Sequence, residues 1–345
     1  MSKLKAAPQP LRPAVEFFLT LAGLALYAAV AFVWVALHTP LSAGTSAASQ
    51  VVRIERGAST ARIASLLEER GIIADRRLFR LASRLTGLER RLKAGSYLLS
   101  PGMSAWQVVR TLVEGKEIEL TVTFPEGSTA AEVAQRLAEA GLVEREAFLR
   151  LAAHPGELYG DHLPPLLQGV SNLEGYLFPD TYRFSSSEDA SAIARRLVDR
   201  FLAVAGPIYA RSQVKDRLTF HEFVTLASLV EKEAALEEER PLVAAVFLNR
   251  LRRHIPLQSC ATVNYVLPER KARLSTKDLA VESPYNTYLH RGLPPGPIAN
   301  PGRASLEAVA HPARVDYLYF VARGDGGHYF SRTFREHLQA KNRTQ

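Results

Sequence analysis

The sequence predicts an α+β protein that is held at a membrane by one N-terminal helix. Three observations lead to this prediction: an uncharged stretch of 21 residues, a strand–turn–helix pattern that recurs, and an amphipathic helix with two glutamates on its apolar side. At 345 residues the chain is long enough for about two domains with a sizeable core. We therefore expect a transmembrane helix, then small α+β modules, then a mixed α/β domain built around the glutamate-bearing helix.

Composition and charge argue against several classes of function. The net charge is +8, but the basic residues are scattered and form no dense run with interleaved aromatics, so no nucleic acid is expected as a partner. A mildly basic protein suits an anionic membrane surface or an anionic cell-wall polymer. Cys260 is the only cysteine, the nine histidines lack ligand spacing such as HExxH, and no P-loop or GxGxxG is present. We predict no metal and no cofactor.

The N-terminal region is typical of a membrane anchor. Residues 1–16 form a short basic tail, and residues 17–37 carry no charge, which is enough helix to span about 30 Å of hydrocarbon. A secretory signal has a shorter apolar region of about 7–15 residues, so we expect an uncleaved span, although the small residues after it leave cleavage open. Basic residues before the span place the N-terminus in the cytoplasm and everything beyond the linker at residues 38–50 outside the inner membrane.

An internal repeat follows the linker. Residues 53–73 match residues 123–143 at an offset of 70, and residues 96–116 are a looser third copy. Each copy predicts a short strand, a glycine turn, a Ser or Thr cap, and an amphipathic helix that ends at a glycine. Gly57 and Gly71 of the first copy align with Gly127 and Gly141 of the second.

These small units resemble LysM modules, which bind N-acetylated glycans. The resemblance is one of pattern, and α+β packing units without a ligand are the equal alternative. On this interpretation residues 51–116 form a LysM-like domain. Residues 117–345 form the larger domain, and residues 117–150 at its start resemble a second LysM-like repeat.

An acidic and aromatic motif lies within the mostly helical region that follows. The motif spans residues 172–184, a predicted loop and strand, and its candidate binding residues are Glu174, Tyr176, Asp180 and Tyr182. Aromatic faces stack on the C–H groups of pyranose rings, and carboxylates accept hydrogen bonds from hydroxyls. Sugar binding is therefore the functional interpretation, and ordinary packing of aromatics is the alternative.

The stretch from Thr219 to Arg240 predicts the central helix. At about 100° per residue its apolar side chains fill one arc, whereas Thr225, Ser228 and Lys232 fall on the side expected to face solvent. Glu231 and Glu233 interrupt the apolar arc. Apolar surroundings raise the pKa of a carboxyl group and keep it protonated for use as a general acid. The alternative is that such a glutamate extends to the edge of a groove or pairs with an arginine.

The C-terminal third predicts a second helix and a functional loop. The helix begins at Pro241 and ends in Asn249 and Arg250. Residues 283–302 contain several prolines and glycines between polar and aromatic residues, and a long loop of this kind is usually functional. Residues 317–330 predict two strands around a Gly-rich turn, and a short helix follows.

Seven motifs together resemble the endolytic murein transglycosylase family, also called MltG or YceG-like, over nearly the whole chain. They are EGYLFPDTY, ASLVEKEA, VFLNRL, LQSCATV, SPYNTY, GLPPGPIANPG and YLYFVARGDGGH. The resemblance implies a lyase that cleaves the β-1,4 bond between N-acetylmuramic acid and N-acetylglucosamine in nascent peptidoglycan. It also implies that strand elongation is terminated in this way and that penicillin-binding proteins are neighbours.

The resemblance carries a catalytic residue with it. The family's glutamate is the first of the EKE motif, here Glu231, which acts as the single acid/base and leaves 1,6-anhydro ends. Many relatives carry an aspartate where this chain has Cys260, so no second carboxylate is assigned at that position. The residues predicted to contact substrate outside the acidic and aromatic motif are Asn249, Gln258, Thr262, Tyr285, Asn286 and Tyr288.

Two other interpretations stay open. A conventional muramidase would use Glu231 with Glu174 or Asp180 and a water molecule, because hydrolysis needs two carboxylates. A non-catalytic, membrane-tethered scaffold that binds glycan would need neither.

Overall fold

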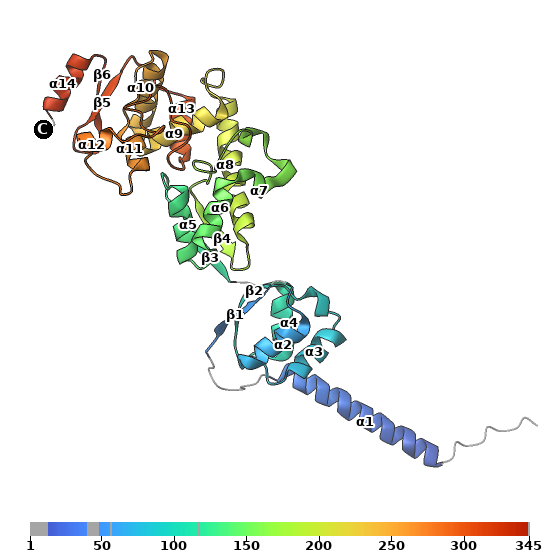
Figure 1. Ribbon diagram of the computed structural model, residues 1–345. Coiled ribbons are helices and arrows are strands. Elements are labelled where there is room, and N and C mark those ends of the chain that lie inside the picture. The colour runs from blue at the N-terminus through green and yellow to red at the C-terminus, as the bar shows by residue number, and fades with distance from the viewer. Residues whose placement is uncertain (1–12, 40–47, 56, 116–117, 344–345) are drawn as a thin grey trace, which may run out of the picture. The chain divides into compact units, whose positions relative to one another are not determined.

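The computed structural model describes residues 13–39, 48–55, 57–115 and 118–343 (Figure 1). The chain divides into two compact units. The first is Met1–Glu119 with Ser185–Ser187, and the second is Leu120–Phe184 with Glu188–Gln345. Most of the predicted tail, most of the predicted linker and the predicted domain boundary at residues 116–117 lie outside the described residues.

The first helix, α1 (Pro13–His38), is the predicted apolar helix. Its segment Phe17–Val35 has a mean hydropathy of 2.2, and none of that segment is buried inside the protein. A soluble helix hides its apolar side chains against a core, whereas these side chains have no such cover. By length and composition α1 is able to cross a membrane.

After α1, the first unit has the order β-α-α-β-α. The elements are β1 (Gln50–Ile54), α2 (Thr60–Glu69), α3 (Arg76–Leu85), the 3₁₀ turn η1 (Glu89–Arg91), β2 (Gly95–Leu99) and α4 (Ala105–Glu114). β1 and β2 pair antiparallel, with Val52 opposite Tyr97. Both side chains are fully buried, with Leu67, Phe79 and Leu112 in the same core. The helices thus cover the face of the ladder that carries alternate apolar residues.

The second unit is mostly helical. Its first part contains β3 (Glu119–Thr123), α5 (Ala130–Glu139), α6 (Arg145–Ala153), α7 (Pro155–Tyr159), η2 (Gly160–His162), η3 (Pro165–Leu167), β4 (Thr181–Ser185) and α8 (Ala190–Ala210). Its second part contains α9 (Phe220–Glu233), η4 (Glu237–Glu239), α10 (Arg240–Arg252), α11 (Cys260–Val266), α12 (Thr276–Leu279), α13 (Arg303–Ala310), β5 (Tyr319–Ala322), β6 (His328–Ser331) and α14 (Phe334–Asn342). β3 pairs with β4, and β5 pairs antiparallel with β6.

The three predicted strand–turn–helix copies are present. Ser59, Ser104 and Thr129 cap α2, α4 and α5, and each accepts a hydrogen bond from the backbone N–H three residues later. The chain leaves each helix through a left-handed glycine, at Gly71, Gly115 or Gly141. A glycine is required there because other residues are strained at this backbone angle. The local part of the prediction is therefore correct.

Helix α9 is the centre of the second unit. It packs against α10 and α13, and these helices are seen together in Figure 1. The α9 helix ends at Glu233 rather than Arg240, because Ala234 takes up an extended backbone conformation before η4. The prediction that Thr225 and Ser228 face solvent is wrong, since both are buried. The Ser228 hydroxyl instead accepts a hydrogen bond from the Ile298 N–H, 3.1 Å away.

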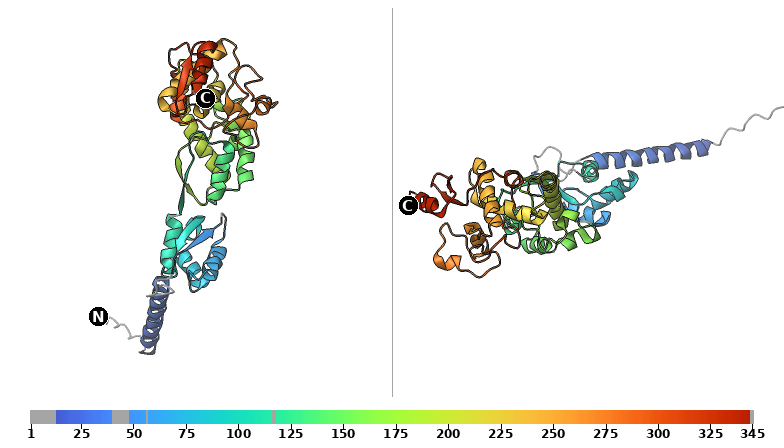
Figure 2. Two further views of the ribbon diagram at one scale, coloured as in Figure 1. Left: turned by 90° about the vertical axis from the view of Figure 1, so that its left-hand side faces the viewer. Right: turned by 90° about the horizontal axis from the view of Figure 1, so that it is seen from above.

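The predicted C-terminal elements are found where the sequence places them. Residues 283–302 contain neither helix nor strand, and β5, β6 and α14 follow as a hairpin and a short helix. Figure 2 shows this hairpin and α14 at one end of the second unit, whereas α5 and α6 lie at the other. The loop at residues 283–302 is joined to the buried α9 by the hydrogen bond between Ile298 and Ser228.

Candidate active site

A cavity of about 660 Å³ lies at the C-terminal end of α9. Five segments meet there: the start of α5, the loop before β4, the last turn of α9, α11 with the residues after it, and the loop at residues 283–302 through Ile298. The side chains from these segments that matter below are Glu132, Glu174, Lys232, Glu233, Cys260 and Tyr265. The cavity therefore combines three carboxylates with an aromatic ring and other polar groups, which makes it a candidate active site.

Glu233 is the last residue of α9 and lines this cavity. Its Oε1 accepts hydrogen bonds from the Ser259 hydroxyl and from the Ala261 N–H, the latter at 3.3 Å. Within the described parts of the chain no donor is bonded to its Oε2. One oxygen is thus anchored at the start of α11, and the other is available to a ligand.

Glu174 lines the same cavity from the loop before β4. The residue is 8% exposed. Its Oε1 accepts from the Ala130 N–H at the start of α5, at 2.9 Å, and the Tyr265 hydroxyl donates to Oε2 at 3.4 Å. Burial raises the pKa of Glu174 to about 7, although these hydrogen bonds oppose the shift. The cavity therefore holds a carboxyl group that is part protonated at neutral pH.

Glu231 has different surroundings. Its Oε1 forms an ion pair with the Arg240 guanidinium at 3.2 Å, and its Oε2 accepts from the Gly302 N–H at 2.9 Å. The side chain is 5% exposed and is not among the residues that line the cavity. The apolar surroundings expected for Glu231 are therefore wrong: an arginine from the next helix supplies a countercharge, which is the alternative that the sequence left open. Burial and the nearby Glu231 carboxylate together raise the pKa of Glu126.

Two predicted tyrosines lie close to the cavity wall. The Tyr285 ring packs on Tyr265, with ring centroids 5.0 Å apart. The Tyr288 hydroxyl lies 3.1 Å from the Cys260 sulfur, and Cys260 lines the cavity. Burial raises the pKa of the Cys260 thiol, so this residue is a neutral polar group rather than a charged one.

Five other predicted contact residues are buried, and hydrogen bonds within the protein hold them. They are Tyr176, Tyr182, Asn249, Thr262 and Asn286. Tyr176 bonds His221, and Tyr182 donates to the Phe178 carbonyl. The amide nitrogen of Asn249 donates to two carbonyls before β5, and that of Asn286 donates to two carbonyls at the end of α12 and just after it. These side chains fix the shape of the unit and do not line the cavity at Glu233.

The two remaining predicted residues also lie elsewhere. Asp180 is partly exposed and forms an ion pair with Arg200 at 3.0 Å. Gln258 is exposed, and its backbone N–H donates to the Thr287 carbonyl. Asp180 was predicted from the acidic and aromatic motif, and Gln258 lies in the LQSCATV motif, but neither residue lines the cavity at Glu233.

Sequence reasoning missed several residues that line the cavity, including Lys232, Asn264, Tyr265 and Arg270. Tyr265 is the second residue after the LQSCATV motif, and the proximity of that aromatic residue to the motif was an available signal. Asn264 and Arg270 gave no comparable signal.

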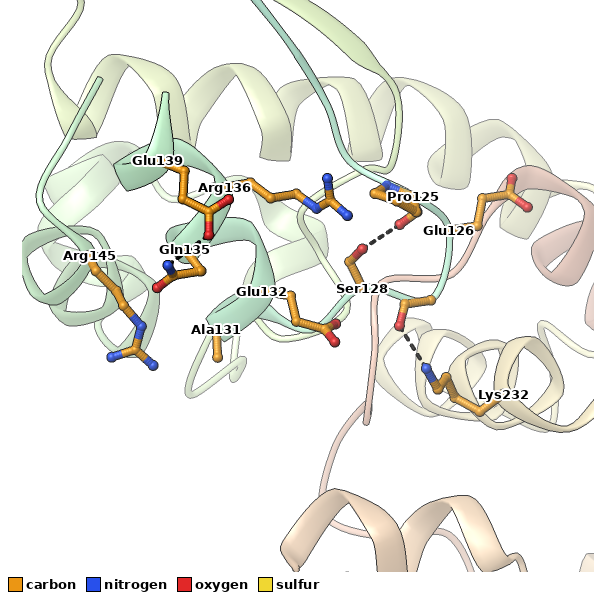
Figure 3. A pocket seen from close by; sticks show the side chains of 11 residues that line it. Pro125, Glu126, Ser128, Ala131, Glu132, Gln135, Arg136, Glu139, Arg145 and Lys232 are labelled. Carbon is orange, nitrogen blue, oxygen red and sulfur yellow. Dashed lines mark hydrogen bonds between the residues drawn. The ribbon is translucent and has the colours of Figure 1, made fainter. Parts of the chain in front are cut away.

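A second cavity, of about 640 Å³, adjoins the first (Figure 3). The two cavities share Ala131, Glu132 and Lys232. The Lys232 ammonium donates to the Gly127 carbonyl at 2.9 Å, which ties the end of α9 to the turn before α5. Burial and the nearby Arg270 lower the pKa of Lys232. Along the described chain no group of three or more His, Cys, Asp or Glu side chains is arranged to hold a metal ion.

Known proteins share this arrangement of sequence and fold. The endolytic murein transglycosylase of Bacillus subtilis strain 168 is 33% identical over 306 residues, which cover 85% of this chain and 84% of that protein. The protein of the same name from Streptococcus pneumoniae serotype 2 strain D39 is 33% identical over 317 residues, or 83% of this chain and 56% of that protein.

A crystal structure at 2.6 Å and a family model give the same result. The crystal structure is of a YceG-like protein from Listeria monocytogenes, with a TM-score of 0.58 and 35% identity; the match covers 85% of this chain and 99% of that one. The model of the YceG-like family matches residues 52–343. The chain belongs to the YceG-like family.

Proposed function

We propose that this protein is an endolytic lytic transglycosylase that cleaves the bond between N-acetylmuramic acid and N-acetylglucosamine in nascent peptidoglycan. The observation that carries the proposal is the cavity at the end of α9, in which Glu233 presents one unbonded carboxylate oxygen beside the buried Glu174. Two relatives described above are named endolytic murein transglycosylases, and the substrate class follows from that name.

One carboxyl group is enough for this reaction. The protonated acid donates its proton to the leaving glycosidic oxygen as the bond to the anomeric carbon breaks. The resulting carboxylate then takes the proton of the muramoyl 6-hydroxyl, whose oxygen attacks the anomeric carbon of the same sugar. The acid regains its proton, no water is consumed, and the product ends in a 1,6-anhydro ring. Because the nucleophile belongs to the substrate, orientation supplies much of the rate.

Two glutamates of α9 are candidates for the catalytic acid/base. The sequence predicts Glu231, and we propose Glu233. Both oxygens of Glu231 are engaged, one by Arg240 and one by Gly302, so proton transfer to a sugar would first have to break an ion pair. Glu233 lines the cavity, and its anchored Oε1 holds the other oxygen in one orientation. In this assignment Glu231 positions the loop at residues 283–302 through its bond to Gly302.

Glu174 and Tyr265 complete the proposed site. Tyr265 offers an aromatic wall and a hydroxyl, and its hydrogen bond to Glu174 fixes both side chains. A part-protonated Glu174 can donate to or accept from a sugar hydroxyl or an N-acetyl group. These contacts would hold the strained, oxocarbenium-like sugar close to Glu233.

A hydrolytic muramidase is the second candidate, because Glu174 is another carboxyl group in the same cavity and its pKa is raised to about 7. Hydrolysis would use one carboxyl group as the acid and the other as the base or nucleophile. Mass spectrometry of the released muropeptides separates the two reactions. A product lighter than the hydrolysis product by one water supports the lytic reaction, and a free reducing end supports the muramidase.

Substitution of each glutamate by glutamine tests the assignment of the acid. We expect Glu233→Gln to lower the rate of glycan cleavage by about 10²–10⁴-fold, because a positioned acid/base contributes that factor. Glu231→Gln should keep a measurable rate but lower the melting temperature, since it leaves the Arg240 guanidinium without its countercharge. An inactive Glu231→Gln of unchanged stability, together with an active Glu233→Gln, would return the role to Glu231.

We also propose that α1 is an uncleaved inner-membrane anchor, with the tail in the cytoplasm and both units outside. The uncharged, unburied α1 supports this, as do the basic residues before it. The full-length protein should fractionate with inner membrane and keep its N-terminal residues. Recovery of a mature chain that begins between Ala43 and Ser49 would show that the helix is a cleaved signal instead. In this location the enzyme can terminate elongation of new strands beside penicillin-binding proteins.

A further inference from the structure

We propose that the second cavity binds the acidic stem peptide of the muramic acid sugar whose glycosidic bond is cleaved. The inference rests on the proposed function, because it assigns the sugar backbone to the cavity that holds Glu233. It adds a peptide-binding site and a preference for strands that carry peptides.

The first argument is the connection between the cavities. Each has a volume of about 640–660 Å³, and Glu132 and Lys232 lie on the walls of both. A muramic acid residue is itself branched, because its lactyl group carries a peptide away from the glycan backbone. A sugar bound beside Glu233 would therefore have a neighbouring space, across Glu132 and Lys232, for its branch.

The second argument is a pair of arginines on the wall of the second cavity. Arg136 of α5 and Arg145 of α6 lie on its wall, and Figure 3 shows both side chains. Among the described residues the Arg136 side chain has no ion pair or hydrogen bond. Within the described part of the chain, Arg145 pairs only with the exposed Glu146, at 3.3 Å. An exposed ion pair of this kind contributes little to stability and is easily exchanged for another partner. Both arginines are therefore available to a carboxylate ligand.

The third argument is that the acidic residues of this cavity are already engaged. Glu132 accepts from the Thr129 N–H in the cap of α5, and Glu139 accepts from the Gln135 amide at 2.9 Å. Burial and the Glu231 carboxylate raise the pKa of Glu126. The two arginines keep N–H donors that, among the described residues, only Glu146 accepts from, and a stem peptide offers the carboxylates that they bind best.

The test compares glycan strands that carry complete stem peptides with strands from which an amidase has removed them. The enzyme is the full-length protein in detergent, either wild type or with Arg136→Gln and Arg145→Gln together. Arg150→Gln is the matched control, because Arg150 is an exposed residue of α6 that lines neither cavity. We expect the double variant to raise KM about tenfold on peptide-bearing strands, as the loss of two exposed ionic contacts allows, and to cleave bare strands like wild type.

A binding measurement keeps the test independent of cleavage. Titration calorimetry with a soluble disaccharide pentapeptide should show binding to wild type and to Arg150→Gln, and binding about tenfold weaker to the double variant. Equal effects on both kinds of strand, or unchanged binding of the disaccharide pentapeptide, would overturn the peptide site. If wild type cleaves neither strand but the variants still differ in binding, the proposed function fails and the peptide site stands.

Discussion

Glu174 is a residue whose ionisation the fold changes strongly. Its side chain lies between the start of α5 and Tyr265, and its pKa is raised to about 7 by burial. In the unfolded chain the Glu174 carboxyl group loses its proton near pH 4.5, whereas in the folded chain it keeps the proton until about pH 7. Between these values the folded state binds more protons, so its stability falls as the pH rises.

Replacement of Glu174 by glutamine should remove this dependence. At pH 8 we expect Glu174→Gln to be more stable than wild type by roughly 3 kcal/mol, and at pH 4 to be about equal to it. The glutamine oxygen still accepts from the Ala130 N–H, so the cap is kept. Urea unfolding of a fragment that begins at Gln50, measured from pH 4 to pH 8, checks this. Parallel stability curves for the two proteins would contradict it.

The sequence predicted the glutamate-bearing helix that lines the candidate site, but not the surroundings of its two glutamates. Residue angles on a helix show that Glu231 and Glu233 leave α9 in different directions. They do not show what lies in each direction. Arg240 comes from the next helix, and Gly302 comes from a loop 71 residues further along the chain. Ser259, which anchors Glu233, is 26 residues away in sequence. Contacts of this length follow from the fold and not from local periodicity.

At the scale of elements, the loop at residues 283–302 is held against α9 and against the loop before β4. Asn300 is fully buried: its Oδ1 accepts from the Leu177 N–H and its amide nitrogen donates to the Ser128 carbonyl, each at 2.8 Å. Gly175, next to Glu174, has a left-handed φ of +87° and lies directly under Pro297. The position of Glu174 therefore depends on a close approach of two loops.

Gly175→Ala should disturb this approach. An added Cβ would lie 2.3 Å from the Pro297 Cβ, and the backbone angle is itself strained for alanine. We expect a loss of about 3 kcal/mol in unfolding free energy, together with lower activity. Gly169→Ala is the control, because Gly169 has a φ of +79° and no atom within 4 Å of the added carbon. It should lose only about 1 kcal/mol. Equal losses in thermal or urea unfolding would show that the contact with Pro297 is unimportant.

The elements that the sequence predicted best are those with local signals. The repeated glycine turns and Ser or Thr caps correctly predicted α2, α4 and α5, because capping depends on only a few neighbouring residues. The solvent-facing side of α9 was predicted wrongly. Ser228 and Thr225 are polar, but their hydroxyls donate to backbone carbonyls of the same helix, so both can be buried without loss. A polar residue therefore does not by itself mark an exposed face.

At the scale of the whole molecule, the chain divides into two compact units. Every residue of the candidate site belongs to the second unit. The first unit has its own core and its own β1–β2 ladder. Its proposed LysM-like role, the capture of polymeric glycan, would be separate from cleavage.

Deletion of residues 51–116 tests that separation. We expect the deletion to weaken binding to polymeric glycan more than it slows cleavage of short oligosaccharides, because the cavity at Glu233 receives no side chain from this segment. Sedimentation with purified sacculi measures the first property, and product release from a defined oligosaccharide measures the second. Equal losses in both would mean that the segment is structurally required by the catalytic unit.

The turns of the repeated motif differ in how freely their length and sequence can change. In the second copy, the Gly127 N–H donates to the Asn300 carbonyl and the Gly127 carbonyl accepts from Lys232. An inserted residue there would therefore distort the second cavity, which Gly127 and Lys232 line. In the first copy, the space around Gly57 is open. Evolution can therefore lengthen or vary the first turn without touching the chemistry. The same turn is the place to insert an epitope or a fluorescent label when the protein is followed in living cells.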